Sequence, residues 1–230
     1  LIVMDRPNPN AHYVDGPVLD LENQSFVGMH EVPIVYGLTI GEYATMINKE
    51  GWLNNNMKSN LTIIELKNYN RKVTYDLPIL PSPNLPNRKS INLYPSLCLF
   101  EGTNVSAGRG TEMQFQIYGS PYLNKEKNNF RFTPKKNSGS KYPKHENLLC
   151  FGKNLSENKK LDKFDLSFLL NAYSDTNDKQ NFFNNYFDKL AGTNSLKNQI
   201  ISGLSEKKII QSWKKKLDIY KEMRMKYLIY

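Results

Sequence analysis

The order of an apolar strand, an amphipathic helix and a second apolar strand most constrains the fold of this 230-residue chain. Leu1–Met4 is wholly apolar, residues 40–49 carry apolar side chains at helical spacing, and Leu61–Leu66 is rich in β-branched residues. Because parallel strands need a crossover connection, this order predicts a βαβ unit in a mostly parallel sheet and an α/β fold. Thr39 with Glu42 three residues later fits a capping box, which gives Glu42 a structural explanation.

The first four residues also carry information. An all-apolar strand of this kind is typical of strands that are buried on both faces. The chain has no initiator Met and no signal-peptide pattern, so we expect it to begin inside a domain whose earlier part is missing. Any localisation signal would be missing with it. No apolar run approaches the roughly 18 residues that a membrane span needs.

A proline-rich segment interrupts the chain between residues 78 and 95. It contains Pro78, Pro81, Pro83, Pro86 and Pro95. Because proline lacks a backbone donor, we expect no helix in this segment and place a domain boundary near residue 78. Beyond it, strands are expected near 97–100, 113–118, 130–134 and 148–152, with a mobile polar loop at 135–144. Helices are expected from about residue 161, and the last runs from a Ser205 cap to about Lys226.

The segment from Glu101 to Thr111 is the best candidate for a binding site. It has glycines at 102, 108 and 110, and it places Glu101, Asn104 and Arg109 close together with three hydroxyl residues. Glycine is costly in strands and helices but permits close approach of a backbone to a ligand. Polar groups that converge at the end of a strand favour a binding site. A glycine-rich surface turn is the alternative, and so is an ion pair between Glu101 and Arg109 that braces the loop.

Two further segments place polar side chains in stiff, proline-bounded loops. Arg6 and Asn8 follow the first strand, where α/β proteins place ligand contacts, and Asn84 lies between prolines 83 and 86. Glycoside hydrolysis usually needs an acid and a second carboxylate. Glu101 is the best candidate, with Asp5 and Glu112 weaker. Arg109 suits bidentate recognition of a substrate carboxylate.

The motifs and spacings in the sequence exclude several classes of site. No Ser-His-Asp arrangement, P-loop or dinucleotide fingerprint is visible, and the spacing of His and Cys does not suit a metal, so we expect no cofactor and no metal. Cys98 and Cys150 could form one bridge, which the sequence leaves open. Residues 81–230 carry 25 Lys/Arg against 13 Asp/Glu, which fits nucleic acid, an acidic glycan or a lysine-rich surface. The aromatic residues lie at core spacing, which disfavours nucleic acid.

A series of motifs resembles one bacterial family along the whole chain. In order they are residues 5–9 (DRPNP), 16–17 (GP), 26–28 (FVG), 37–42 (GLTIGE), 81–86 (PSPNLP), 101–106 (EGTNVS), 108–111 (GRGT) and the terminal segment 224–230. The chain thereby resembles the NamZ-type exo-β-N-acetylmuramidases, which were formerly of unknown function.

The resemblance implies an architecture and an activity. It implies that residues 1–78 are the C-terminal portion of a Rossmann-like catalytic domain and that residues 79–230 form an α+β auxiliary domain ending in helices, with the cleft between them. It also implies release of N-acetylmuramic acid from the non-reducing end of peptidoglycan fragments, in the periplasm or after secretion. The lactyl carboxylate of that sugar would pair with Arg109 or Arg6, Asn84 and Asn104 would hold substrate, and Glu101 would be catalytic.

The chain departs from the family pattern in two places. Many relatives have His where this chain has Tyr36, and they carry a Pro-Glu-His-Gly stretch before the position of Leu1 that would hold a catalytic glutamate. Residues 1–230 alone are therefore expected to be inactive. The alternative function is a non-catalytic protein that binds peptidoglycan or another glycan.

Overall fold

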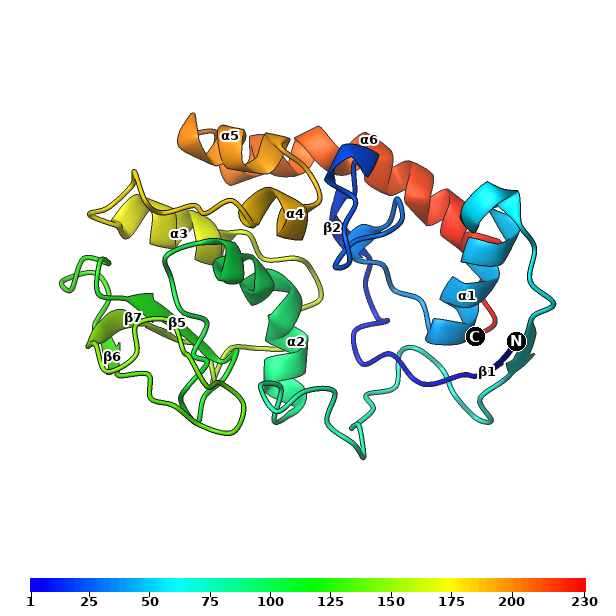
Figure 1. Ribbon diagram of the computed structural model, residues 1–230, viewed down its shortest axis with the longest axis horizontal. Coiled ribbons are helices and arrows are strands. Elements are labelled where there is room, and N and C mark those ends of the chain that lie inside the picture. The colour runs from blue at the N-terminus through cyan, green and yellow to red at the C-terminus, as the bar shows by residue number, and fades with distance from the viewer.

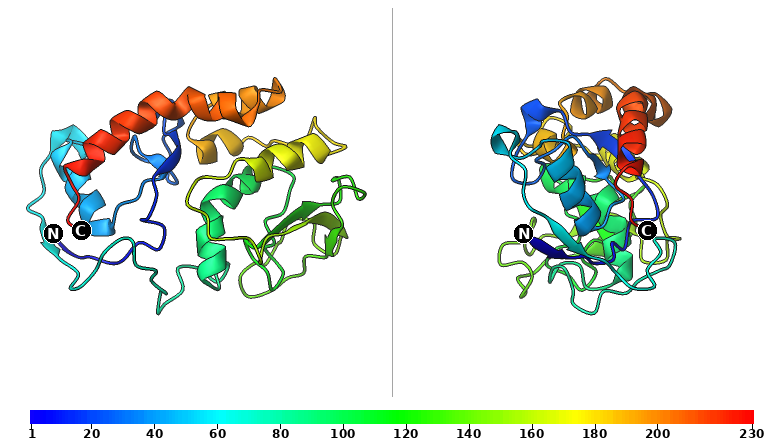
Figure 2. Two further views of the ribbon diagram at one scale, coloured as in Figure 1. Left: turned by 180° about the vertical axis from the view of Figure 1, so that it is seen from behind. Right: turned by 90° about the vertical axis from the view of Figure 1, so that its right-hand side faces the viewer.

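The computed structural model, drawn in Figure 1, describes all of residues 1–230. It contains two separate hydrophobic clusters. The larger cluster has 24 buried residues, all between Leu93 and Leu217. The smaller one combines side chains of the first part of the chain with two from its end: Val18, Leu38, Met46, Tyr220 and Tyr227. The helix α6 (Glu206–Met225) contributes to both clusters, and Figure 2 shows it extending over both parts of the molecule.

The predicted strand–helix–strand unit is confirmed. Strand β1 (Ile2–Met4) pairs in parallel with β4 (Thr62–Ile64), and α1 (Ile40–Lys49) lies between them in sequence. The capping box is also confirmed, because Thr39 N donates to Glu42 Oε2 at 2.9 Å while Thr39 Oγ1 accepts from Glu42 N at 3.3 Å. The sequence therefore specifies both where α1 begins and how its strands pair.

Within residues 1–230, β1 is covered on one face only, so burial on both faces stays a prediction. Ile2 and Met4 are 69% and 77% exposed, and Ile64 of the neighbouring strand is 52% exposed. Side chains alternate across a strand, so only one face of this two-stranded sheet turns towards α1. Ile63 lies on that covered face, where its Cγ2 is 2.8 Å from the position that a Cβ on Gly41 would take. The opposite face is apolar and uncovered.

An antiparallel hairpin links the first part of the chain to α6. It consists of β2 (Asp15–Val18) and β3 (Pro33–Val35), with the short 3-10 helix η1 (Leu21–Asn23) between them. A second short 3-10 helix, η2 (Asn54–Asn56), follows α1. The segment after β3 is bound by α6, since Tyr220 Oη donates to the carbonyl of Tyr36 and Arg224 Nη2 to that of Gly37, both at 2.7 Å.

The prediction that no helix forms between residues 78 and 95 is wrong. Helix α2 (Arg88–Leu97) begins at Asn87, whose side chain accepts from Ser90 N at 2.9 Å, and it contains Pro95. A proline leaves the carbonyl four residues earlier without its helical donor. Here that carbonyl belongs to Ile91, and Asn10 Nδ2 donates to it at 2.8 Å. A side chain distant in sequence thus compensates for the proline.

The predicted strand at Leu97–Phe100 is also absent. Its residues are the end of α2 and the start of the 3-10 helix η3 (Cys98–Gly102). All four are buried, because α2 and η3 lie in the larger cluster. A short apolar run that is buried on every side does not distinguish a strand from a helix.

A three-stranded antiparallel sheet and three short helices complete the second part (Figure 1). Its strand order is β5 (Ile117–Ser120), β7 (Cys150–Asn154) and β6 (Phe130–Phe132). The helices are α3 (Ser167–Asp175), α4 (Phe187–Ala191) and α5 (Ser195–Ile201). Strands near 130 and 150 are confirmed. The strand expected over 113–118 starts only at Ile117, because Phe115 has a φ of 51° and lies in a turn.

The last helix matches its sequence pattern. The apolar stripe predicted for it is buried at Ile209, Trp213, Leu217 and Tyr220, while its lysines lie outside the stripe. No helix of the chain combines the length and apolar character that crossing a membrane requires. Cys98 and Cys150 are free thiols, and both are buried.

The ion pair at the start of α1 leads to a test of stability. Glu42 is fully buried, and Arg71 contacts it with both Nη atoms, the nearer at 2.5 Å. We expect Arg71→Met to lower the free energy of unfolding by about 3 kcal/mol, because the buried carboxylate loses its charged partner. Urea denaturation measures the change.

The matched control is Arg88→Met, because Arg88 pairs with Asp76 at the surface. Exposed pairs contribute about 0–1 kcal/mol, so this variant should stay close to the wild type. Equal losses in the two variants would contradict a special role for the buried pair.

Candidate active site

The segment that follows η3 is held in shape by its own side chains and by two glycines. Gly108 and Gly110 have φ values of 80° and 82°, which favour glycine. The three hydroxyl groups that the sequence offered as ligand contacts form hydrogen bonds with nearby backbone groups instead. Thr103 Oγ1 donates to Phe100 O at 2.9 Å, Thr111 Oγ1 donates to Gly108 O at 2.7 Å, and Ser106 Oγ accepts from Gly108 N at 3.2 Å.

The two charged side chains of this loop meet at a cavity wall. Arg109 Nη1 lies 2.5 Å from Glu101 Oε1, and both side chains are partly exposed, at 42% and 28%. The cavity has a volume of about 230 Å³. Its lining consists of Phe100, Glu101, Val105, Ser106, Ala107, Arg109, Ser140, Tyr142 and Lys144. A carboxylate and two cations therefore face one hollow, which we call the Glu101 cavity.

Two neighbouring residues that the sequence reasoning missed fix this loop. Lys144 Nζ donates to the carbonyl oxygens of Phe100 at 2.9 Å and of Val105 at 3.1 Å, and it also bonds to that of Thr103. His145 Nε2 lies 2.6 Å from Asn104 O, and because a carbonyl can only accept, the ring proton is on Nε2. Four carbonyls around Glu101 are thus held by one dipeptide.

The electrostatics of Lys144 follow from its position. Burial lowers the pKa of its ammonium to about 8; the Glu101 carboxylate raises it and Arg109 lowers it further. Burial likewise holds the pKa of His145 below its usual value. In the sequence both residues follow Pro143 in a polar stretch, where nothing distinguishes Lys144 from the solvated lysines nearby.

The two candidate asparagines of this region, Asn84 and Asn104, contact segments that form the walls of the Glu101 cavity. Asn84 is buried and its Nδ2 donates to Gly139 O at 2.7 Å, next to Ser140 in the cavity lining. Asn84 Oδ1 and both side-chain polar atoms of Asn104 are buried without a hydrogen-bond partner in the chain. The structure therefore brings Asn84 beside the cavity that holds Glu101 and Arg109, while the amide of Asn104 is closed off from it.

Arg6 and Asn8 line a different cavity. It has a volume of about 390 Å³ and lies between the turn after β1 and residues 77–81. Asn8 is anchored there, since its Nδ2 donates to Leu38 O at 2.8 Å. Arg6 is exposed and forms no ion pair. The sequence placed these residues in one site with Glu101, but the structure divides the candidates between two cavities.

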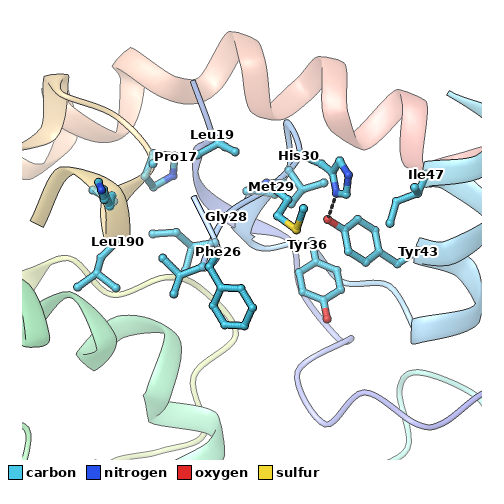
Figure 3. A pocket seen from close by; sticks show the side chains of 17 residues that line it. Pro17, Leu19, Phe26, Gly28, Met29, His30, Tyr36, Tyr43, Ile47 and Leu190 are labelled. Atoms are coloured by element: carbon cyan, nitrogen blue, oxygen red, sulfur yellow. Dashed lines mark hydrogen bonds between the residues drawn. The ribbon is translucent and has the colours of Figure 1, made fainter. Parts of the chain in front are cut away.

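A third cavity contains none of the candidate residues (Figure 3). It has a volume of about 430 Å³ and is lined by the hairpin of β2 and β3, by α1 and by residues 189–192. Figure 3 shows the Tyr43 hydroxyl facing His30, and Tyr43 Oη lies 2.8 Å from His30 Nδ1. Tyr36 stacks on Tyr43 with ring centroids 5.3 Å apart, and Tyr36 also lines the cavity of Arg6.

Comparison with known proteins gives consistent matches along the chain. The family model described as the N-terminal part of exo-β-N-acetylmuramidase NamZ matches residues 1–89, and that of its C-terminal part matches residues 92–230. The peptidoglycan β-N-acetylmuramidase NamZ of Bacillus subtilis is 36% identical over 255 aligned residues, which cover 100% of this chain and 59% of that protein.

Two solved structures from Bacteroides fragilis, both described as DUF1343 family proteins, share the fold. One has a TM-score of 0.95 and 45% identity, and the match covers 100% of this chain and 65% of the solved chain. The other has a TM-score of 0.78 and 22% identity, and its match covers 66% of the solved chain. The chain thus spans about three fifths to two thirds of the length of these relatives.

The position of Lys144 predicts a pH dependence of stability. In the unfolded chain the Lys144 ammonium has its ordinary pKa of 10.5, whereas in the folded chain its pKa is about 8. Unfolding therefore takes up a proton between these values, so the free energy of unfolding contributed by Lys144 rises with pH. Relative to Lys144→Met, the wild type should gain stability between pH 8 and 10, by at most about 1.4 kcal/mol per pH unit.

Urea denaturation of both proteins at several pH values measures this difference. Lys125→Met is the control, because Lys125 is exposed and forms no ion pair, and its difference from the wild type should not change with pH. If the difference in free energy of unfolding between Lys144→Met and the wild type also stays constant with pH, burial does not perturb the pKa of Lys144.

Proposed function

The chain belongs to the NamZ family of exo-β-N-acetylmuramidases, and we propose that it acts in releasing N-acetylmuramic acid from the non-reducing end of peptidoglycan fragments. The observation that carries this proposal is the match of both family models, in order, over residues 1–89 and 92–230. The function is glycoside hydrolysis in the turnover or recycling of the cell wall. Since peptidoglycan lies outside the cytoplasm, we also propose that the protein acts in the periplasm or after secretion.

The Glu101 cavity supplies groups that suit this chemistry. Glycosidases pass through a transition state in which positive charge develops on the sugar ring, and a carboxylate beside the ring stabilises that charge. We propose this electrostatic or acid/base role for Glu101. Its partner Arg109, 2.5 Å away, sets the direction of the carboxylate and keeps its remaining donors near the cavity.

The same cavity suits the acidic substituent of the substrate. N-acetylmuramic acid carries a lactyl carboxylate, and Arg109 presents a cation at the cavity wall. The Lys144 ammonium adds positive charge there, while its three donors remain bonded to backbone carbonyls. Ser140 is a further lining residue, on the turn that Asn84 holds through Gly139. We propose that Arg109 and Ser140 contact the sugar, that Asn84 positions the turn of Ser140, and that Asn104 anchors the segment of Glu101 through the contact of its carbonyl with His145. Arg6 and Asn8 would contact substrate from their own cavity.

The domain division is proposed on the same basis. Residues 1–78 would be the C-terminal portion of a Rossmann-like catalytic domain, and residues 79–230 an auxiliary domain. The two hydrophobic clusters support two units, although α6 contributes side chains to both. The parallel pairing of β1 with β4 is the part of the first unit that fits a Rossmann-like sheet.

The role of Glu101 is tested by Glu101→Gln in the natural gene product, with a chromogenic β-glycoside of N-acetylmuramic acid as substrate. We expect kcat to fall at least about 100-fold with a small change in KM, because the amide keeps the shape but loses the charge that stabilises the transition state.

Glu126→Gln is the control, since Glu126 is exposed and unpaired, and its rate should equal that of the wild type. A near-normal rate for Glu101→Gln, with a lower melting temperature, would mean that the Glu101–Arg109 pair only braces the loop. Binding of glycan without any hydrolysis by the wild type would instead favour the non-catalytic alternative.

A further inference from the structure

Figure 1 shows the loop that connects β6 with β7. This loop is strongly basic, and its exposed charges are not used by the site described so far. Residues 130–144 contain five Lys or Arg and no Asp or Glu. Lys141 is exposed and forms no ion pair. The Lys136 side chain is 60% exposed, and its nearest acid is Glu146 at 3.8 Å. We call residues 135–144 the basic loop.

The basic loop is fixed against the segment that carries Arg109. Lys135 N donates to Gly110 O at 2.8 Å, and a Cβ on Gly110 would lie 2.6 Å from Pro143. Within the loop, Asn137 Oδ1 accepts from Ser140 N at 2.9 Å and closes a tight turn. The lysines that project from the basic loop are therefore positioned by a defined backbone, which lowers the entropy lost when a ligand binds.

A second depression lies on the outer side of this loop and adjoins the Glu101 cavity. Its volume is about 360 Å³, and its lining consists of Lys136, Asn137, Lys141 and Tyr142. Tyr142 lines both hollows, so the two share one wall. The Tyr142 ring is 85% exposed, with Lys136 Nζ 5.6 Å from its centroid. An exposed aromatic ring with a cation beside it thus lines both hollows.

We propose that this depression is an accessory subsite for a second acidic sugar of the glycan strand whose end lies in the Glu101 cavity. The inference rests on the proposed function, because it takes the same class of glycan as ligand. In a strand of alternating N-acetylglucosamine and N-acetylmuramic acid, a carboxylate recurs at every second sugar. Lys136 and Lys141 pair with that carboxylate, and the apolar face of a pyranose ring packs on Tyr142.

A nucleic acid is the competing polyanion for a basic surface with an aromatic ring. The shared wall disfavours it, because Glu101 places a carboxylate beside the path that a phosphate backbone would follow. A sugar polymer carries a carboxylate on only every second sugar, so it does not have to place a negative charge beside Glu101 at each unit.

The test compares two tetrasaccharides that differ only in their lactyl groups. One alternates N-acetylmuramic acid with N-acetylglucosamine and has N-acetylmuramic acid at its non-reducing end, and the other contains N-acetylglucosamine alone. Calorimetric titration at low salt, with every protein carrying Glu101→Gln so that the glycan is not hydrolysed, should show that Lys136→Gln/Lys141→Gln weakens binding of the acidic tetrasaccharide about fivefold to tenfold, as expected for two exposed ion pairs. Binding of the neutral tetrasaccharide should change less than about twofold, whereas Tyr142→Ala should weaken both.

The matched control is Lys207→Gln/Lys208→Gln, which removes the same charge from exposed positions at the start of α6. This variant should bind both tetrasaccharides like the wild type. If both double variants lose the same affinity for the acidic tetrasaccharide, the effect comes from overall charge and the proposal is overturned. Tighter, lysine-dependent binding of a single-stranded oligonucleotide than of the acidic tetrasaccharide would overturn it in favour of nucleic acid.

Kinetics separate this inference from the proposed function. On the chromogenic monosaccharide, Lys136→Gln/Lys141→Gln should have unchanged kcat and KM, because that substrate does not reach the subsite, whereas KM for the acidic tetrasaccharide should rise about fivefold. Hydrolysis by the wild type with no change in this KM overturns the subsite alone. No hydrolysis, together with lysine-dependent binding, overturns the proposed activity and leaves the subsite standing.

Discussion

The buried acid cluster at the start of α1 is the interaction on which the first part of this structure depends. Asp5, directly after β1, accepts from Thr39 Oγ1 at 2.7 Å and from Gly41 N at 2.8 Å, while Glu42 closes the capping box. Two carboxylates at a helix N-terminus are favoured by the helix dipole and by its free donors. The end of the chain completes the cluster, since Tyr230 Oη donates to Asp5 at 2.9 Å.

A different set of hydrogen bonds stabilises the candidate active site. There the donors are side chains, Lys144 and His145, and the acceptors are backbone carbonyls of the segment around Glu101. Irregular backbone cannot pair with itself, so buried carbonyls need donors from elsewhere. As a result, Glu101 and Arg109 lie on a segment that these hydrogen bonds hold in place, with their charged ends at the cavity wall. Asp5 is different, because its oxygens are used by α1.

The candidate site was predicted in part. The density of glycine and polar groups identified the segment of Glu101 and Arg109, since such a composition suits neither strand nor helix. Lys144 was missed because a buried lysine and a solvated one look alike in sequence. Arg6 and Asn8 follow a strand end as predicted, but which cavity they line depends on how the turn after β1 packs against residues 77–81.

The sequence by itself determined the local elements whose signals lie within a few residues. The parallel unit of β1, α1 and β4, the capping box of Glu42 and the apolar stripe of α6 all follow from period and spacing. Only the tertiary structure decided that α2 continues through Pro95, since the compensating donor, Asn10, is 81 residues from the carbonyl that it binds. It also decided which charges meet at the Glu101 cavity. Long-range contacts of this kind leave no periodic trace in a sequence, because each depends on two segments that only folding brings together.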